Sequence, residues 1–232
     1  EVSILRTPRP VLVIRRFDRE VVQDASGTWV RRLHIIDACQ ACDMPVSFKY
    51  ERNVGNTGPA AKYRDGVSFE KLFGLLQYVN KKAVDKLSLL RWALFQFVIG
   101  NCDAHGKNFS FYVGPNGLSA APWYDLVSVS QYPQMSQEIA MAFGDAFKFN
   151  EVQAYPLADF AVRCDIDRRL LAREAQRLHK GVEQHAAALV QSGAYEEDER
   201  LFASGIAQQA LKASALLATT CQEAARLPSK YL

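Results

Sequence analysis

The chain has 232 residues, of which 49% are hydrophobic and 23% are charged, as in an ordinary soluble globular protein with a sizeable core. Its formal net charge of +3 is too small to indicate a nucleic-acid-binding protein by itself. The opening residues EVSILRTPRP lack the pattern of a signal peptide, and the apolar run at 92–99 is far below the roughly 20 residues of a membrane span. We therefore expect a cytoplasmic protein with no membrane contact.

The first 35 residues indicate β-structure. Val11–Arg16 is a short β-branched run, and Thr28–His34 follows a turn at Ala25–Gly27, so we predict that these two segments form a hairpin. A solvated strand face explains the arginines of this region better than contact with DNA phosphates does. These arginines are Arg6, Arg9, Arg15, Arg16, Arg19, Arg31 and Arg32.

The rest of the chain is predicted to be mostly helical. Asp37 can cap a short helix that runs through Cys42 and ends at Pro45, and a loop rich in Gly, Asn and Pro follows at 51–66. The apolar period is helical over 68–99, and its second half, from residue 87, is apolar on nearly all sides, which predicts a buried helix. Beyond residue 150 the Ala- and Leu-rich sequence predicts several more helices. The expected fold is α+β and mostly helical, with a small β-containing head.

The five cysteines do not form the pattern of a disulfide framework, because their number is odd and they are scattered. Cys39 and Cys42 make a C-x-x-C pair, but the chain has no second pair of the kind that a structural zinc site needs. Since this pair falls inside the predicted short helix, we interpret it as two half-buried thiols rather than a redox or metal site.

A polar segment, GNCDAHGKNFSF, follows the predicted buried helix at Gly100–Phe111. Alternating residues at 109–113 then predict a strand, Gly114–Gly117 a tight turn, and Leu118–Trp123 a second strand that ends at Tyr124 and Asp125. The order along the chain is therefore helix, polar loop, strand, turn, strand and acid.

This order matches the needs of phosphoryl transfer from a nucleotide. Kinase catalytic loops carry a base Asp and a metal-binding Asn as D-x-x-x-x-N, and a second metal-binding Asp arrives after a hairpin. Asp103 and Asn108 have this spacing, and Asp125 stands after the predicted hairpin. Each of these residues alone is as well explained by a loop or capping role, but their conjunction favours a phosphotransfer site. Oxygen ligands of this kind suit Mg²⁺.

GNCDAHGKNFSF, followed by APWYDLVS, resembles the catalytic core of the HipA family, bacterial serine/threonine kinases that act as toxins of type II toxin–antitoxin modules. VLVIRRFDRE, RLHIIDACQACDMP and KYE (Lys49–Glu51) also occur in the family's order. The resemblance extends from about residue 11 to residue 135. Beyond residue 150 it is limited to helical character.

The resemblance implies the C-terminal portion of a protein-kinase-like fold. Residues 1–35 would be a remnant of the N-terminal β lobe up to the hinge, and residues 36–232 a helical lobe with the catalytic loop and the metal-binding hairpin. The implied cofactors are ATP and Mg²⁺, with Asp103 as catalytic base and with Asn108 and Asp125 as metal ligands. The residues implied to contact the nucleotide are His105, Gly106, Lys107, Asn108, Tyr124 and Asp125 near the phosphates, and Ile36, Asp37 and Ala38 near the adenine.

One departure from the family pattern concerns the phosphates. The family's phosphate-binding loop, its regulatory serine and its strand lysine lie before the R-F-D-R strand, and EVSILRTPRP contains none of them. Because these groups supply electrostatic stabilisation, we expect this chain to bind nucleotide poorly and to phosphorylate little.

The function implied by the resemblance is transfer of the ATP γ-phosphate to a protein hydroxyl. The family's target is typically an aminoacyl-tRNA synthetase, and phosphorylation of this target inhibits translation. The implied partner is a HipB-like helix-turn-helix antitoxin, through which alone the protein would meet DNA. Two alternatives stay open: a small-molecule phosphotransferase, which can share the D-x-H-x-x-N pattern, and a non-catalytic module that binds an antitoxin.

Overall fold

A computed structural model describes residues 1–232, apart from the side chain of Tyr231. Its centre is helix α3 (Lys82–Val98), whose residues Leu90, Trp92 and Leu94 have no exposed surface. The α+β, mostly helical fold expected from the sequence is confirmed. The predicted boundary at residue 35 stays a prediction.

The helical stretch predicted over 68–99 is interrupted. Ser68 caps α2 (Phe69–Gly74), and a 3-10 turn follows at Leu75–Gln77. At Tyr78–Asn80 the chain instead hydrogen-bonds to Leu118 through the backbone groups on both sides of Val79. The Asn80 N–H and the Tyr78 carbonyl bond to Leu118 and are not available for hydrogen bonds within a continuous helix. Helix α3 therefore begins only at Lys82.

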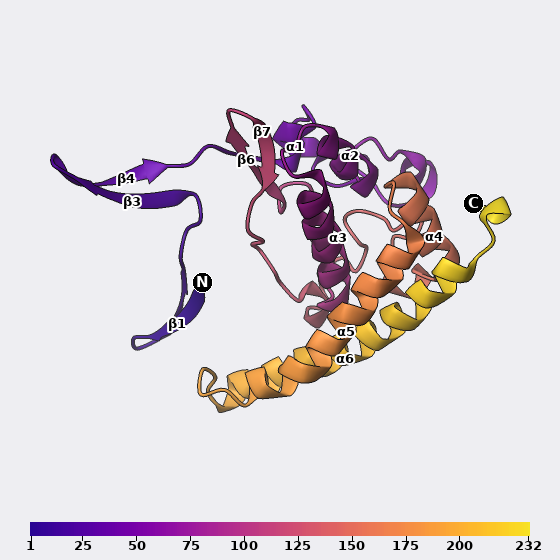
Figure 1. Ribbon diagram of the computed structural model, residues 1–232. Helices are drawn as coiled ribbons and strands as arrows, with labels where there is room; N and C mark the ends of the chain where they lie inside the picture. The colour runs from indigo at the N-terminus through magenta and orange to yellow at the C-terminus, as the bar shows by residue number, and fades with distance from the viewer.

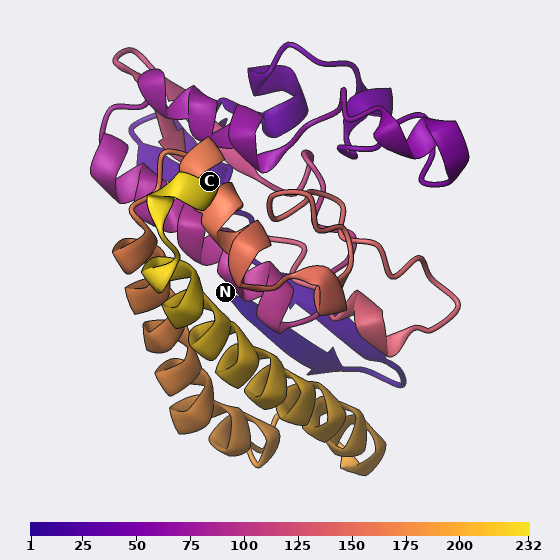
Figure 2. The same ribbon diagram turned by 90° about the vertical axis from the view of Figure 1, so that its right-hand side faces the viewer.

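Three further helices complete the body. The helices α4 (Ala154–Arg163), α5 (Arg168–Val190) and α6 (Glu197–Arg226) follow in order, and α5 and α6 run side by side as a long antiparallel pair (Figures 1 and 2). The first half of α5 packs on α3, and the distal ends of the pair project beyond it. Within the part of the chain that the structure describes, no helix is long and apolar enough to cross a membrane.

Short 3-10 helices occur along the connecting loops, and one more follows α6. Their bounds are Val46–Phe48, Gly58–Lys62, Val129–Gln131, Phe149–Glu151 and Ser229–Tyr231.

A three-stranded antiparallel sheet carries the segments on both sides of the polar loop. Its order is β5 (Ile35–Asp37), β6 (Ser110–Gly114) and β7 (Gly117–Ala120). The four-residue helix α1 (Ala38–Ala41) follows β5 directly, and Asp37 caps it as predicted. The strand expected over 118–123 is shorter, because the chain leaves the sheet after Ala120.

The first 32 residues form two separate hairpins, which extend to one side of the helical body in Figure 1. Strand β1 (Val2–Arg6) pairs with β2 (Pro10–Ile14), and β3 (Arg19–Asp24) pairs with β4 (Gly27–Arg32). The hairpin predicted between 11–16 and 28–34 is therefore wrong. Each segment pairs with its nearest neighbour in the chain, and Gly27 at φ +124° allows the tight turn between β3 and β4.

Candidate active site

The polar loop begins where α3 ends. Gly100 adopts a left-handed φ of +69°, and a Cβ there would lie 2.1 Å from Ser130 Oγ, so glycine is required. Asn101 is buried and its amide Nδ2 donates to Gln96 Oε1 at 2.8 Å and to the Asp125 carbonyl at 3.2 Å. Its Oδ1 accepts the backbone N–H of Asp103 at 3.1 Å. Asn101 thus ties the loop to the segment that carries Asp125.

Asp103, Asn108 and Asp125 line one cavity of about 280 Å³, together with Asn101. Asn108 Nδ2 donates to the Asp103 carbonyl at 3.0 Å, which turns the amide so that Oδ1 is the atom available to a cation. Asp125 holds a left-handed φ of +56°, a conformation that Asp tolerates better than most residues. Three predicted site residues, separated by up to 22 positions, therefore meet at one place.

The donor set fits magnesium. Mg²⁺ is bound by one or two carboxylates and retains several waters, so one carboxamide oxygen and nearby carboxylates suffice. No group of three or more His, Cys, Asp or Glu in the described residues is arranged to hold a metal ion.

Asp103 also lines a second cavity of about 280 Å³. Tyr50, Arg52 and Glu138 are among its other lining residues, and the Tyr50 hydroxyl donates to Asp103 Oδ1 at 2.6 Å. Asp103 therefore stands between two cavities.

His105 and Gly106 pack closely against neighbouring side chains. His105 is buried and meets the Tyr50 ring edge-on, with 5.1 Å between the ring centroids; its burial lowers its pKa, so the imidazole is neutral at pH 7. It lines neither cavity. A Cβ on Gly106 would lie 2.7 Å from the Val67 side chain. The His105 N–H nevertheless donates to the Asp103 carbonyl at 2.8 Å, and its own carbonyl accepts the Asn108 N–H at 2.8 Å, so His105 helps to shape the loop.

Lys107 and Tyr124 connect the loop to its surroundings. The Lys107 ammonium forms an ion pair with the Asp37 carboxylate at 2.5 Å, and this contact raises the pKa of Lys107. The Tyr124 hydroxyl bonds to the Lys107 carbonyl and lies 2.7 Å from Ser110 Oγ. Both side chains are already engaged with protein groups.

The predicted adenine-side residues lie in β5 and α1. The Ala38 N–H donates to the carbonyls of Gly106 and Phe109, and the Asp37 N–H donates to Gln40 Oε1 at 3.0 Å. Ile36 pairs with Phe111 inside the sheet. The backbone N–H groups of Asp37 and Ala38 are therefore occupied, and the Asp37 side chain is engaged with Lys107.

The R-F-D-R segment at 16–19 reaches the same region. The Phe17 ring packs on Tyr112 and Tyr124, with centroid distances of 6.1 and 5.7 Å, and the Tyr112 hydroxyl donates to the Phe17 carbonyl at 3.1 Å. Asp18 is buried and receives two hydrogen bonds from Arg16 at 2.6 and 2.8 Å. The motif thus holds the chain between the two N-terminal hairpins beside Tyr124.

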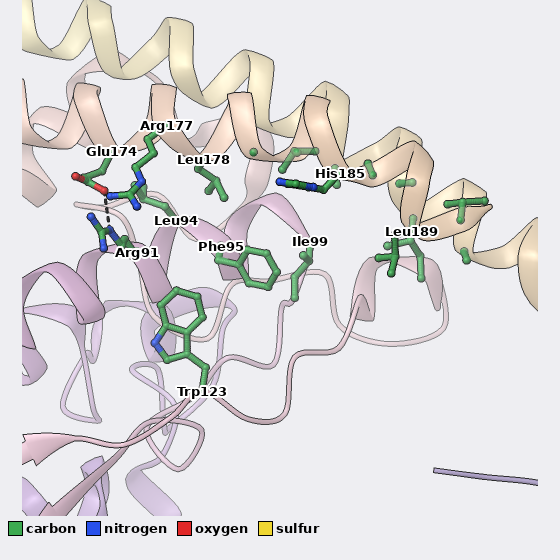
Figure 3. Close-up of a pocket in the computed structure, with 18 of the residues that line it drawn as sticks. Arg91, Leu94, Phe95, Ile99, Trp123, Glu174, Arg177, Leu178, His185 and Leu189 are labelled. Carbon is green, nitrogen blue, oxygen red and sulfur yellow. Dashed lines mark hydrogen bonds and ion pairs between the residues drawn. The ribbon is translucent and has the colours of Figure 1, made fainter. Parts of the chain in front are cut away.

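A cavity of about 510 Å³ lies elsewhere, between α3, α5 and α6 (Figure 3). Phe95, Trp123 and Leu178 are among its largely apolar lining residues, and the Arg91–Glu174 ion pair at 2.7 Å is at one end. It contains none of the residues of the polar loop. Its size alone therefore does not mark it as a phosphotransfer site.

Comparisons with known proteins identify relatives of this chain. The chain is 40% identical over 201 residues to the serine/threonine-protein kinase toxin HipA of Shewanella oneidensis, which covers 86% of this chain and 46% of that protein. It is 35% identical over 207 residues to the putative kinase Y4mE of Sinorhizobium fredii, covering 87% of this chain and 46% of that protein.

Among solved structures, the chain matches the Shewanella oneidensis toxin–antitoxin complex of HipA, HipB and operator DNA. The TM-score is 0.88 at 36% identity, and the match covers 98% of this chain and 54% of the matched one. The chain therefore spans about half the length of these relatives. The sequence model of the HipA-like C-terminal domain matches residues 1–190, and the chain belongs to this family.

Proposed function

We propose that this chain carries the catalytic loop of an ATP- and Mg²⁺-dependent serine/threonine protein kinase. The observation that supports this most is the meeting of Asp103, Asn108 and Asp125 in one cavity, with the spacing that kinase catalytic loops use. Homology to a kinase toxin and to a putative kinase favours the same reaction.

In the proposed reaction, Asp103 orients the acceptor hydroxyl and takes its proton as the oxygen attacks the γ-phosphorus in line with the leaving ADP oxygen. Asn108 Oδ1 and the Asp125 carboxylate would hold Mg²⁺, which when bound neutralises charge on the phosphates. Asn101 keeps the two segments in register through its bonds to Asp103 and Asp125. The chain's own contribution is thus mainly position and electrostatics.

Partners follow from the relatives. The matched HipA structure is a complex with HipB and operator DNA, so we propose a HipB-like antitoxin as a partner and DNA only through that complex. From the family resemblance we also propose that the phosphorylated protein is an aminoacyl-tRNA synthetase. Its phosphorylation would inhibit translation.

The test uses the protein encoded by the whole reading frame. Asp103→Asn keeps the size of the side chain but removes the base, and we expect transfer of the γ-phosphate to fall by about 10²–10⁴-fold. The measurement is incorporation of label from γ-labelled ATP into protein. Asp198→Asn, a similar change at an exposed site in α6, is the matched control and should retain full transfer.

Other outcomes distinguish the alternatives. Unchanged transfer by Asp103→Asn would show that Asp103 is not the base. Transfer to a metabolite but never to protein would identify a small-molecule phosphotransferase. Stable binding of a helix-turn-helix protein with no nucleotide turnover at all would identify a non-catalytic antitoxin-binding module.

A further inference from the structure

Tyr50 contacts the proposed base from a position 53 residues earlier in the chain. Its hydroxyl donates to Asp103 Oδ1 at 2.6 Å. We propose that Tyr50 is a positioning residue for Asp103, which holds one carboxylate oxygen and leaves Oδ2 to meet the acceptor hydroxyl. This inference rests on the proposed function of Asp103 as the base.

The Tyr50 ring is restrained on several sides. The His105 ring meets it edge-on, and the Lys49 ammonium lies 4.9 Å from its centroid. Its backbone is packed so closely that a Cβ on Gly66 would lie 1.8 Å from the Tyr50 carbonyl oxygen. The Gly106 N–H also donates to the Lys49 carbonyl at 2.8 Å, which joins this segment to the catalytic loop itself. Tyr50 therefore has little freedom to leave Asp103.

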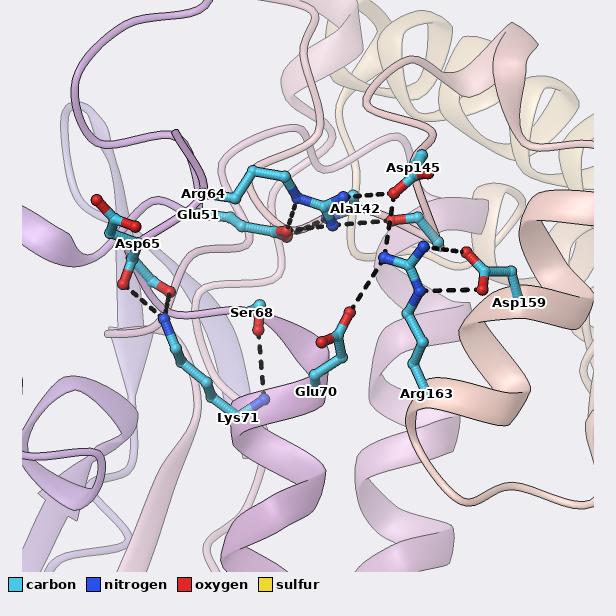
Figure 4. Close-up of polar contacts among 12 residues, drawn as sticks. Glu51, Arg64, Asp65, Ser68, Glu70, Lys71, Ala142, Asp145, Asp159 and Arg163 are labelled. Carbon is cyan, nitrogen blue, oxygen red and sulfur yellow. Dashed lines mark hydrogen bonds and ion pairs between the residues drawn. The ribbon is translucent and has the colours of Figure 1, made fainter. Parts of the chain in front are cut away.

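Glu51, the next residue, fixes the backbone beside Tyr50 through buried hydrogen bonds (Figure 4). Its side chain is only 2% exposed, and it accepts hydrogen bonds from Arg64 Nε at 2.6 Å and from the Ala142 N–H at 2.7 Å. The Glu51 N–H donates to the Ala140 carbonyl at 3.0 Å. Because the backbone of this segment is held in place, the Tyr50 hydroxyl can fix the orientation of the Asp103 carboxylate.

The electrostatics of the contact favour the same role. Burial raises the pKa of Tyr50 well above that of a free tyrosine, and the hydrogen bond to Asp103 raises it further, so Tyr50 remains a protonated donor. Tyr50 would thus keep donating to Oδ1 and keep the Asp103 carboxylate oriented.

The test is Tyr50→Phe in the protein of the whole reading frame, with hydrolysis of Mg·ATP followed as phosphate release, because this assay needs no protein substrate. We expect kcat to fall roughly tenfold, the size of one lost hydrogen bond to a charged group, while KM for ATP stays the same. Because phenylalanine keeps the ring and its packing, a lower kcat at constant KM reports the loss of the hydroxyl that orients Asp103.

Tyr63→Phe is the matched control, since Tyr63 lies in the loop that follows Tyr50 and is 55% exposed; it should leave kcat and KM unchanged. If Tyr50→Phe retains the wild-type kcat while Asp103→Asn is inactive, the positioning role is overturned and the proposed function stands. If wild type and Asp103→Asn release phosphate equally, or neither does, the proposed function fails and this inference fails with it.

Discussion

Asp18 shows how one side chain can hold a whole segment in place. Its carboxylate is buried and bonds to the guanidinium groups of Arg16 and Arg19, and its carbonyl accepts the Leu33 N–H at 3.0 Å. The hydrogen bonds from Arg16 lower the pKa of Asp18 to about 2. This contact stabilises the base of the β3–β4 hairpin beside the Phe17 ring.

A carboxyl with a lowered pKa stabilises the folded form above its unfolded pKa of about 4, and this contribution is lost as the pH falls towards 2. Asp18→Asn should therefore destabilise residues 17–34 at pH 7 by about 1 kcal/mol, a modest value because Arg16 is largely exposed. Amide hydrogen exchange measures this as faster exchange in the variant. The difference from wild type should shrink at about pH 2–3, and a difference independent of pH would contradict the ionic origin.

At the residue scale, the sequence predicted the parts of the site that depend on local spacing. Asp103 and Asn108 lie in one loop, and Asp125 follows a hairpin that periodicity reveals, so their meeting could be expected. Tyr50 and Asn101 could not be assigned, because their roles depend on which distant groups they touch. The available sequence signal for Asn101 was an amide side chain placed between the end of the apolar helix and Asp103.

At the scale of elements, a charged network joins the loop at 51–66 to α4 and to the segment before it (Figure 4). Arg64 bonds to the nearly inaccessible Glu51 and to Asp145 at 2.5 Å. Arg163, on α4, reaches Asp145 at 3.1 Å and Asp159 at 2.7 Å. Burial raises the pKa of Glu51 although the Arg64 guanidinium opposes it, so the buried acid depends on its partner.

Arg64→Met should cost about 3–5 kcal/mol of unfolding free energy, because it leaves Glu51 buried without its counter-charge. The additional change Glu51→Gln should recover part of this loss. Lys148→Met is the control: it removes an ion pair with Glu151 whose two side chains are 59% and 46% exposed, and it should cost about 1 kcal/mol or less. Urea denaturation measures all three, and equal losses for Arg64→Met and Lys148→Met would refute the importance of burial.

Element identity was more predictable than element pairing. The apolar period located α3 and the later helices, and capping chemistry located α1. The partner of β2 was missed because β1 lies in ten residues with little alternation, and the break before α3 was missed because it depends on a bond between Tyr78 and Leu118. Both errors concern contacts that a local pattern does not contain.

At the scale of the whole molecule, the hydrophobic core begins with β5 and α1 and includes no residue of the first two hairpins. These hairpins expose many large apolar side chains, and their strands have open edges. The exposed residues are Val2, Leu5, Val11, Leu12, Val13, Ile14, Val21, Trp29 and Val30.

Deletion of residues 1–33 should therefore leave a helical body that melts cooperatively, with a modest decrease in Tm from loss of the Phe17 contacts. Circular dichroism measures the transition. Size-exclusion chromatography should show less self-association than the full chain, because open edges and exposed apolar strands favour aggregation. Loss of the cooperative transition would show that the hairpins are part of the folding unit.

The first hairpin touches the far end of the body through charges. Arg6 bonds to Glu196 at 3.2 Å, to Glu199 and to the Ala194 carbonyl at 3.0 Å, where α6 begins. These groups are partly exposed, and salt screens exposed charges over a distance that shortens from about 8 Å at physiological ionic strength to about 3 Å at 1 M. Because ion pairs tie the first hairpin to the start of α6, we expect its position to respond to salt, whereas the packed hydrophobic core should not.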